Sequence, residues 1–244
     1  MKTVIIVQAR MTSTRLPGKV LKTVLGKSLL EYMIERLSRV KLADEIVIAT
    51  TTNSTDQPII NLCEKLSVSH YRGSEEDVLA RYYGAATEHK ADVVVRVTSD
   101  CPIIDPQVID EVIQRYLDLK QYDYVSNGLS RSFPRGMDTE VFSYAALQEA
   151  FLEAAEQPDR EHVTPFIYRH PERYRLANVL YAQDQSRHRW TVDTMEDFVL
   201  IREIIEALYS INPEFSLADV LALMEKNPDW SMINAHVEQK QYGQ

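Results

Sequence analysis

The chain opens with the stretch Val4-Ile5-Ile6-Val7-Gln8-Ala9-Arg10-Met11-Thr12-Ser13-Thr14-Arg15-Leu16-Pro17-Gly18-Lys19. Its apolar start predicts a buried strand, which leads directly into a loop that carries Arg10, Arg15 and Lys19. No acidic residue occurs in the first 30 positions, although the whole chain has a formal net charge of −9. Because α/β sheets bind phosphates in the loop after a first strand, this basic loop predicts a phosphate site.

The composition is that of a globular protein, with 244 residues of which 45% are hydrophobic. This length fits one large α/β domain, and no apolar run approaches the roughly 20 residues of a membrane span. Cys63 and Cys101 fall in predicted interior elements and suggest no disulfide framework, so we expect a protein of the reducing cytoplasm. The negative net charge argues against nucleic-acid binding, so the basic loop is expected to bind a small anion.

Strand-like and helix-like segments alternate through the first half of the chain. Strands are predicted over residues 3–7, 45–50, 68–71 and 92–97, and apolar stripes at helical spacing occupy residues 29–40, 78–83 and 108–117. Asp105 and Pro106 fit the N-cap and first turn of the third helix. The alternation predicts an α/β fold with a mostly parallel sheet and helices on both of its faces.

The second half is more mixed. We expect helices over residues 141–155, 159–168, 195–209 and 217–226, strands over 174–181 and 190–193, and a loosely held polar tail after Trp230. The segment 121–134 is either an extra sub-domain or an arm that reaches to a second subunit.

Arg10, Arg15 and Lys19 have two readings. They are either solvated loop charges, or they converge with backbone N–H groups on a triphosphate. The position after the first strand and the Pro17-Gly18 turn favour the second reading. Neither a Walker loop nor a Gly-x-Gly-x-x-Gly segment is present in the sequence.

Two acids also follow predicted strands. Asp100 ends the strand over 92–97, and Asp193 ends the short strand over 190–193. Asp100 could simply be a helix cap or a turn residue, and Asp193 could simply cap the helix that follows it. Two acids at strand ends beside a triphosphate loop would also suit Mg²⁺ shared between protein and phosphates.

Several of these motifs resemble those of the CMP–sugar-acid synthetases. Ala9-Arg10-x-x-Ser13-x-Arg15-Leu16-Pro17-x-Lys19 resembles their nucleotide-binding signature, and Val192-Asp193-Thr194-x-Glu196-Asp197 is similar to a segment of the octulosonate cytidylyltransferases. The nearest resemblance is to the bacterial spore-coat polysaccharide branch of this superfamily. It rests on residues 8–10, Arg72-Gly73-Ser74-Glu75-Glu76-Asp77-Val78-Leu79 and Arg160-Glu161-His162-Val163-Thr164-Pro165.

This resemblance implies a three-layer, GT-A-like nucleotide-diphospho-sugar transferase fold, CTP as substrate, Mg²⁺ as cofactor and a homodimer. It implies one nucleotidyltransferase domain over 1–230, with a nucleotide-binding half (1–120), an acceptor-binding half with a possible dimer arm (121–230) and a polar tail (231–244). The predicted activity is transfer of CMP to an anionic acceptor, a nonulosonic or octulosonic sugar acid for bacterial surface polysaccharide, with release of pyrophosphate.

The resemblance also assigns residues. The predicted nucleotide-binding set is Gln8, Ala9, Arg10, Ser13, Arg15, Lys19, Arg72, Gly73, Ser74 and Asp100. Arg15, Lys19 and Asp100 are predicted to be catalytic, and Asp100 and Asp193 to hold the metal. The octulosonate enzymes have Gln-Gly-Asp-Glu-Pro where this chain has Thr98-Ser99-Asp100-Cys101-Pro102, so their base contacts and substrate do not transfer directly. Because Arg15 and Lys19 would contact phosphate, replacing them is expected to cost little stability.

The second half must supply the acceptor site, and Arg135, Asp138, Glu140 and His162 are the candidates. The alternatives are a turn that leads into a strand for the first three and a structural role for the histidine. A glycosyltransferase on the same fold is a rival function, although the Asp-x-Asp motif usual in such enzymes is absent at Asp100. A non-catalytic nucleotide-binding subunit is a second rival, but it would lack the two metal acids.

Overall fold

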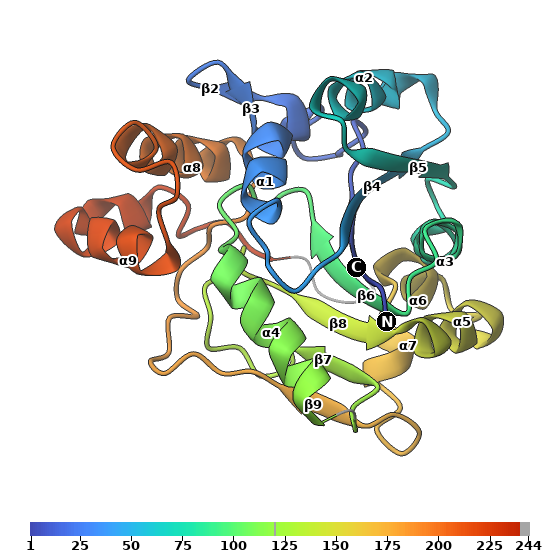
Figure 1. Ribbon diagram of the computed structural model, residues 1–244. Coiled ribbons are helices and arrows are strands. Elements are labelled where there is room, and N and C mark those ends of the chain that lie inside the picture. Colours follow the sequence, from blue (N-terminus) through green and yellow to red (C-terminus); the bar gives the residue numbers. More distant parts are fainter. Residues whose placement is uncertain (120, 240–244) are drawn as a thin grey trace.

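The computed structural model describes residues 1–119 and 121–239. Within them one mixed sheet has the strand order β5-β4-β1-β6-β8-β7-β9 (Figure 1). Its strands are β1 (Thr3–Gln8), β4 (Glu45–Thr51), β5 (Ser69–Gly73), β6 (Val93–Thr98), β7 (Tyr124–Ser126), β8 (Glu140–Ser143) and β9 (Leu176–Asn178). Only β8 runs against its neighbours, and a separate hairpin pairs β2 (Thr23–Val24) with β3 (Lys27–Ser28).

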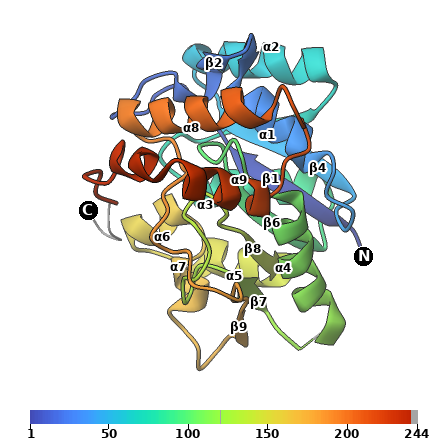
Figure 2. The same ribbon diagram turned by 90° about the vertical axis from the view of Figure 1, so that its left-hand side faces the viewer.

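Helices cover both faces of the sheet, so the protein has three layers (Figures 1 and 2). Strand β1 shows why: Ile5 and Val7 belong to one buried cluster, whereas Val4 and Ile6 belong to another on the opposite face. One face carries α1 (Leu29–Leu37), α2 (Gln57–Leu66), α4 (Pro106–Leu119), α8 (Met195–Leu208) and α9 (Leu217–Lys226). The other carries α3 (Val78–Glu88), α5 (Tyr144–Glu153), α6 (Gln157–His162) and α7 (Pro165–Tyr168). The predicted fold class is confirmed.

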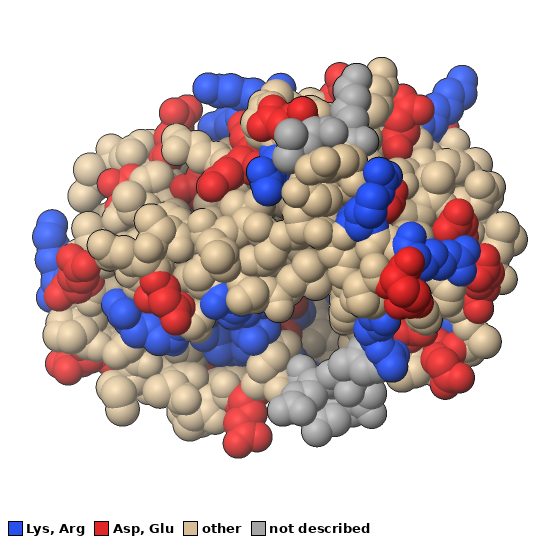
Figure 3. All heavy atoms as spheres, turned by 90° about the horizontal axis from the view of Figure 1, so that it is seen from below, with Lys and Arg blue, Asp and Glu red and all other residues tan. Residues whose placement is uncertain are grey.

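Three short 3₁₀ turns complete the described part of the chain: η1 (Lys19–Leu21), η2 (Ser54–Asp56) and η3 (Pro228–Met232). Among the described residues, no helix is long and apolar enough to cross a membrane. On the face shown in Figure 3, Lys and Arg side chains are interspersed with Asp and Glu around a central hollow.

Strand order brings particular loops together. Gln8 lies opposite Thr98 in the parallel pair of β1 and β6, so the loops that follow these strands leave the same edge of the sheet. Strand β8 is antiparallel to β6, with Glu140 opposite Arg96. The segment that precedes β8 therefore reaches this edge as well.

The four strands predicted in the first half are confirmed, and so is the start of α4, where the Asp105 carboxylate accepts a hydrogen bond from Gln107 N–H at 2.8 Å. The helix predicted over 141–155 is wrong at its start, because Glu140–Ser143 forms β8 and Ser143 caps α5. The sub-domain alternative for 121–134 is also wrong, because β7 pairs within the central sheet.

Four further expectations for the second half are corrected. The helix predicted over 159–168 is interrupted at Val163, whose φ of 74° is left-handed, and α7 starts again at Pro165. The strand predicted over 174–181 is limited to β9, and residues 190–193 lie outside any strand. The tail is held at least as far as Asn234, whose exposed fraction is 4%, whereas residues 240–244 lie outside the described part.

Gly136 allows the segment before β8 to touch the segment before α8. Its φ is 105°, and a Cβ there would lie 2.6 Å from the carbonyl oxygen of Trp190. Hydrogen bonds from Arg135 N–H to His188 O (3.0 Å) and from Trp190 N–H to Arg135 O (2.7 Å) fix the two segments. These contacts set the position of the Asp193 loop.

We therefore expect Gly136→Ala to lower the free energy of unfolding by about 1–3 kcal/mol through backbone strain, with a further loss from the clash. The matched control is Gly26→Ala, since Gly26 has a similar φ of 81° but no atom within 4 Å of the added Cβ. Urea unfolding measures both. Equal losses in the two variants would show that the contact with Trp190 does not matter.

Candidate active site

The basic loop after β1 is folded back on itself and tied to its neighbours. Gly18 N–H donates to Met11 O at 2.8 Å, and Met11 N–H donates to the Asp56 carboxylate at 2.8 Å. Asp56 is fully buried and also accepts hydrogen bonds from the hydroxyls of Thr50 and Thr51, at 3.0 and 2.6 Å. This anchor holds the loop at the edge of the sheet.

Glu75 is the counter-charge of Arg10. The Arg10 guanidinium lies 3.3 Å from the Glu75 carboxylate, which also accepts hydrogen bonds from the Thr12 hydroxyl and the Asn53 amide. Glu75 lines the cavity described below together with Arg10. A phosphate that binds Arg10 must therefore compete with this carboxylate.

Lys19 lies at the centre of the site. Its Nζ is 3.2 Å from Asp100, 2.8 Å from Asp193 and 2.7 Å from the backbone oxygen of Val192. Burial lowers the pKa of Lys19, but the two carboxylates raise it above its ordinary value overall. Burial likewise raises the pKa of Asp100, but the Lys19 charge and a hydrogen bond from Thr98 lower it overall.

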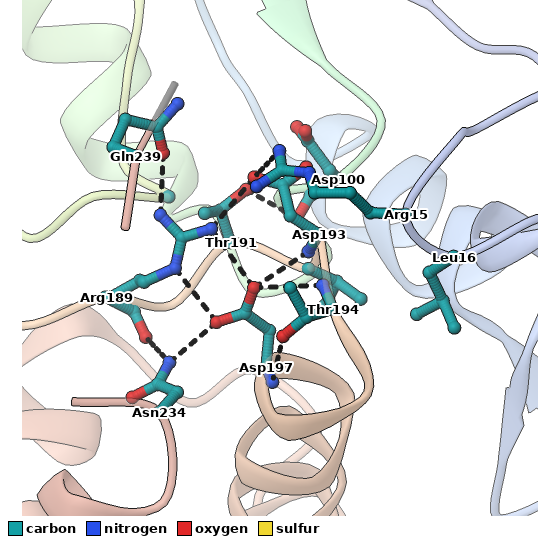
Figure 4. A network of polar contacts seen from close by, with 12 residues as sticks. Arg15, Leu16, Asp100, Arg189, Thr191, Asp193, Thr194, Asp197, Asn234 and Gln239 are labelled. Atoms are coloured by element: carbon teal, nitrogen blue, oxygen red, sulfur yellow. Dashed lines mark hydrogen bonds and ion pairs between the residues drawn. The ribbon is translucent and has the colours of Figure 1, made fainter. Parts of the chain in front are cut away.

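Asp193 is held from two sides, as Figure 4 shows. Its Oδ1 contacts Lys19, whereas its Oδ2 lies 3.0 Å from Arg15 and 2.9 Å from Arg189. The alternative of a helix cap is wrong for Asp193, because Thr194 is the N-cap of α8. A helix cap is wrong for Asp100 as well, because α4 begins at Pro106, but the alternative of a turn residue is confirmed, because Asp100 lies in a turn after β6.

The donor set at this point fits a magnesium ion. Within the described residues no group of three or more His, Cys, Asp or Glu side chains could hold a metal ion. Mg²⁺, however, commonly takes only one or two carboxylates and completes its coordination with phosphates and water. The Lys19 ammonium is a cation already seated between two such carboxylates, Asp100 and Asp193.

These residues face a cavity of about 970 Å³. Its lining brings together most of the predicted site from both halves of the chain: Gln8, Ala9, Arg10, Ser13, Arg15, Lys19, Asp100, Arg135, Asp138, His162 and Asp193. Burial lowers the pKa of His162, which favours a neutral imidazole near pH 7.

Four predicted residues are not in this lining: Arg72, Gly73, Ser74 and Glu140. The Arg72 guanidinium donates to the backbone oxygens of Thr51 and Asn53, both at 3.0 Å. The Glu140 carboxylate pairs with Arg96 and accepts hydrogen bonds from Tyr124 and Thr164. In this structure both side chains fix neighbouring segments rather than face the cavity.

The sequence analysis missed two arginines that line the cavity, Arg81 and Arg96, and it named Arg160, which also lines the cavity, only as part of a motif. Arg96 interrupts the otherwise apolar β6 and donates to the Gln8 side chain at 3.2 Å, so a lone charge in a buried strand was a usable signal. Arg160 pairs with Asp77 across α6 and α3. No sequence pattern indicates that pairing, because the partners are far apart in the chain.

Comparison with known proteins identifies the family. A family model described as cytidylyltransferase matches residues 4–236. The chain belongs to the cytidylyltransferase family, and this membership implies nucleotidyltransferase activity.

Individual relatives agree. The spore coat polysaccharide biosynthesis protein SpsF of Bacillus subtilis is 36% identical over 92% of this chain and 94% of its own length. A 3-deoxy-manno-octulosonate cytidylyltransferase of Pelobacter propionicus is 34% identical over 46% of this chain and 44% of its own length. A solved cytidylyltransferase of Leptospira borgpetersenii is 32% identical, with a TM-score of 0.91 over 99% of this chain and all of that one. The predicted resemblance is confirmed.

The contacts of Lys19 with Asp100 and Asp193 lead us to expect a larger loss of stability on its replacement than the sequence alone suggests. We expect Lys19→Met to lower the free energy of unfolding at neutral pH by roughly 3–5 kcal/mol, because two partly buried carboxylates lose their shared cation. In the wild type this stabilisation is present above the ordinary pKa of Asp100 and is lost as the pH falls through its lowered folded value. In the variant Asp100 loses the Lys19 charge that lowers its pKa and takes up a proton at higher pH, so the gap between the two proteins should narrow as the pH falls.

Urea unfolding of both proteins at about pH 7 and about pH 4.5 measures this gap across the range where carboxylates titrate. Lys65→Met is the matched control, because the Lys65 side chain is 68% exposed. A gap of the same size at both pH values would contradict the assignment of the loss to the two acids.

Proposed function

We propose that this protein transfers CMP from CTP to an anionic acceptor with the aid of Mg²⁺. One observation carries the proposal: the basic loop after β1, the two acids and the second-half residues Arg135, Asp138 and His162 line a single cavity. The families of the relatives named above support CTP as the donor. A sugar acid of the nonulosonic or octulosonic type is the proposed acceptor, and bacterial surface polysaccharide is its proposed destination.

In the proposed reaction an acceptor oxygen bonds to the α-phosphorus of CTP, and the bond from that phosphorus to the pyrophosphate oxygen breaks. The acceptor hydroxyl releases its proton to solvent water, and pyrophosphate leaves with the electron pair of the broken bond. Arg15 and Lys19 would give up their ion pairs with Asp193. Their positive charges would then neutralise the negative charge that develops on the departing pyrophosphate. Mg²⁺ on Asp100 and Asp193 would supply Lewis-acid stabilisation of the phosphates.

Arg135 supports an anionic acceptor. Its guanidinium lines the cavity and has no ion-pair partner among the described residues. Burial and the nearby Arg131 lower the pKa of Arg135 overall, although Asp138 and Asp193 act in the opposite direction. A carboxylate or phosphate on the acceptor would provide that partner.

A pyrophosphate-release assay with CTP and Mg²⁺ tests this function. The acceptor panel should contain nonulosonic acids, an octulosonic acid, smaller sugar acids and matched neutral sugars. We expect release only with an acidic acceptor. A glycosyltransferase would release no pyrophosphate, and a non-catalytic nucleotide-binding subunit would turn over none of these mixtures. A homodimer and a cytoplasmic location also belong to the proposal, and sedimentation of the purified chain tests the first.

We expect CTP to raise the melting temperature more than UTP, ATP or GTP, because a pocket matched to cytosine should exclude purines and the uracil edge. Thermal-shift titration with the four nucleotides in the presence of Mg²⁺ measures this preference. Equal stabilisation by ATP or GTP would contradict a cytidylyltransferase pocket.

Asp100→Asn and Asp193→Asn should each reduce pyrophosphate release by at least about 10²-fold, since each removes a charge that acts directly on the reacting phosphates. Asp110→Asn is the control, because the Asp110 carboxylate accepts hydrogen bonds from Lys41 and Leu42 N–H and is not part of the cavity lining. Normal turnover by both variants would remove the metal from the proposed mechanism.

A further inference from the structure

The two oxygens of Asp193 have different kinds of partner. Lys19, on Oδ1, lines the active-site cavity, and so does Arg15, on Oδ2. Arg189, also on Oδ2 at 2.9 Å, is absent from that lining. Bound phosphates would therefore draw Lys19 and Arg15 away from Asp193, whereas Arg189 would stay.

Arg189 is in turn fixed by Asp197. Its Nε and Nη2 donate to the two oxygens of the Asp197 carboxylate at 2.9 and 3.1 Å, so one planar guanidinium spans both acids (Figure 4). Asp197 is fully buried, and it also accepts a hydrogen bond from the backbone N–H of Asp193 at 3.0 Å. It therefore holds Asp193 twice, through the backbone and through Arg189.

The C-terminal segment is part of the same network. Asn234 donates to the Asp197 carboxylate at 2.8 Å and to the backbone oxygen of Arg189 at 2.9 Å. Gln239 accepts from Arg189 at 2.6 Å. A part of the chain that the sequence marks only as a polar tail thus contacts the group that holds Asp193.

We infer that Arg189 is a positioning residue that keeps Asp193 Oδ2 fixed and leaves Oδ1 to the metal, with Asp197 and Asn234 as its supports. The inference rests on the proposed function, because it concerns the use of Asp193 as a metal ligand. Removal of a group that orients a metal-bound carboxylate lowers the affinity for the metal by roughly 10–100-fold.

The experiment must distinguish the proposed support of Arg189 by Asp197 from a purely structural role of Asp197. Asp197 is also the third residue of α8, where it forms a capping box with Thr194. Asp219 forms the equivalent capping box with Ser216 at the start of α9. Asp219→Asn therefore removes the same kind of helix cap without touching Asp193.

The experiment measures Mn²⁺ binding to the full chain by electron paramagnetic resonance, with and without CTP. Mn²⁺ is the probe because it takes the same oxygen ligands as Mg²⁺. Arg189→Met and Asp197→Asn are expected to weaken Mn²⁺ binding by roughly 10–100-fold. Arg189→Lys keeps the charge but not the planar fork, so its affinity should lie between those of wild type and Arg189→Met. Asn234→Ala should weaken binding less, while Asp219→Asn and the exposed-site control His236→Ala should bind as the wild type does.

Circular dichroism and melting curves establish which variants are folded. If Arg189→Met and Asp197→Asn, the variants with the largest expected loss of Mn²⁺ binding, do not fold, Arg189→Lys and Asn234→Ala decide the question. Wild-type Mn²⁺ affinity in the folded variants, or equal losses in Asp197→Asn and Asp219→Asn, would overturn the inference and leave the proposed function intact. Failure of the wild type to bind Mn²⁺ even with CTP would overturn the metal part of the proposed function, and the inference with it.

Discussion

The Lys19 ammonium and the two carboxylates that share it are the contact on which this site depends. Its partners Asp100 and Asp193 lie 81 and 174 positions away in the chain. The three charges meet only when β1 lies beside β6 and the segment before α8 folds over both. Since isolated charges are costly to bury, the cluster favours this arrangement over others and at the same time concentrates charge where a triphosphate would bind.

The first half of the fold could be predicted because its signals are local. Apolar runs of strand length alternate with helical stripes, and the four strands that this half gives to the central sheet, β1, β4, β5 and β6, are parallel to one another. The second half could not be read in this way. Val141 and Phe142 continue into an apolar helix, so the periodicity does not show that β8 ends at Ser143. Within residues 190–193, Trp190 and Val192 pack in the core although the segment forms no strand.

The residues of the site also differ in whether local sequence or tertiary contacts define them. Arg10, Ser13, Arg15 and Lys19 could be predicted because one short loop carries them all. Asp56, Glu75 and Arg189 could not, since each is defined by partners that only the tertiary structure brings near. For Arg72 and Glu140 the sequence indicated a polar group at the right edge of the sheet. The sequence did not indicate that Arg72 donates a hydrogen bond to the backbone oxygen of Thr51, or that Glu140 forms an ion pair with Arg96.

Because β8 runs antiparallel to its neighbours, two different kinds of segment line the same cavity: loops that follow strands and a segment that precedes a strand. The nucleotide-side loops follow parallel strands β1 and β6, and their positions are set by the register of those strands. The segment with Arg135 and Asp138 enters the same edge from the opposite direction, between β7 and β8. Insertions or deletions in residues 127–139 would reshape the wall of the cavity that Arg135 and Asp138 line, while every hydrogen bond between β1, β4 and β6 stays in register. A change in this single connection would thus alter one wall of the cavity and leave the residues that follow β1 and β6 in place.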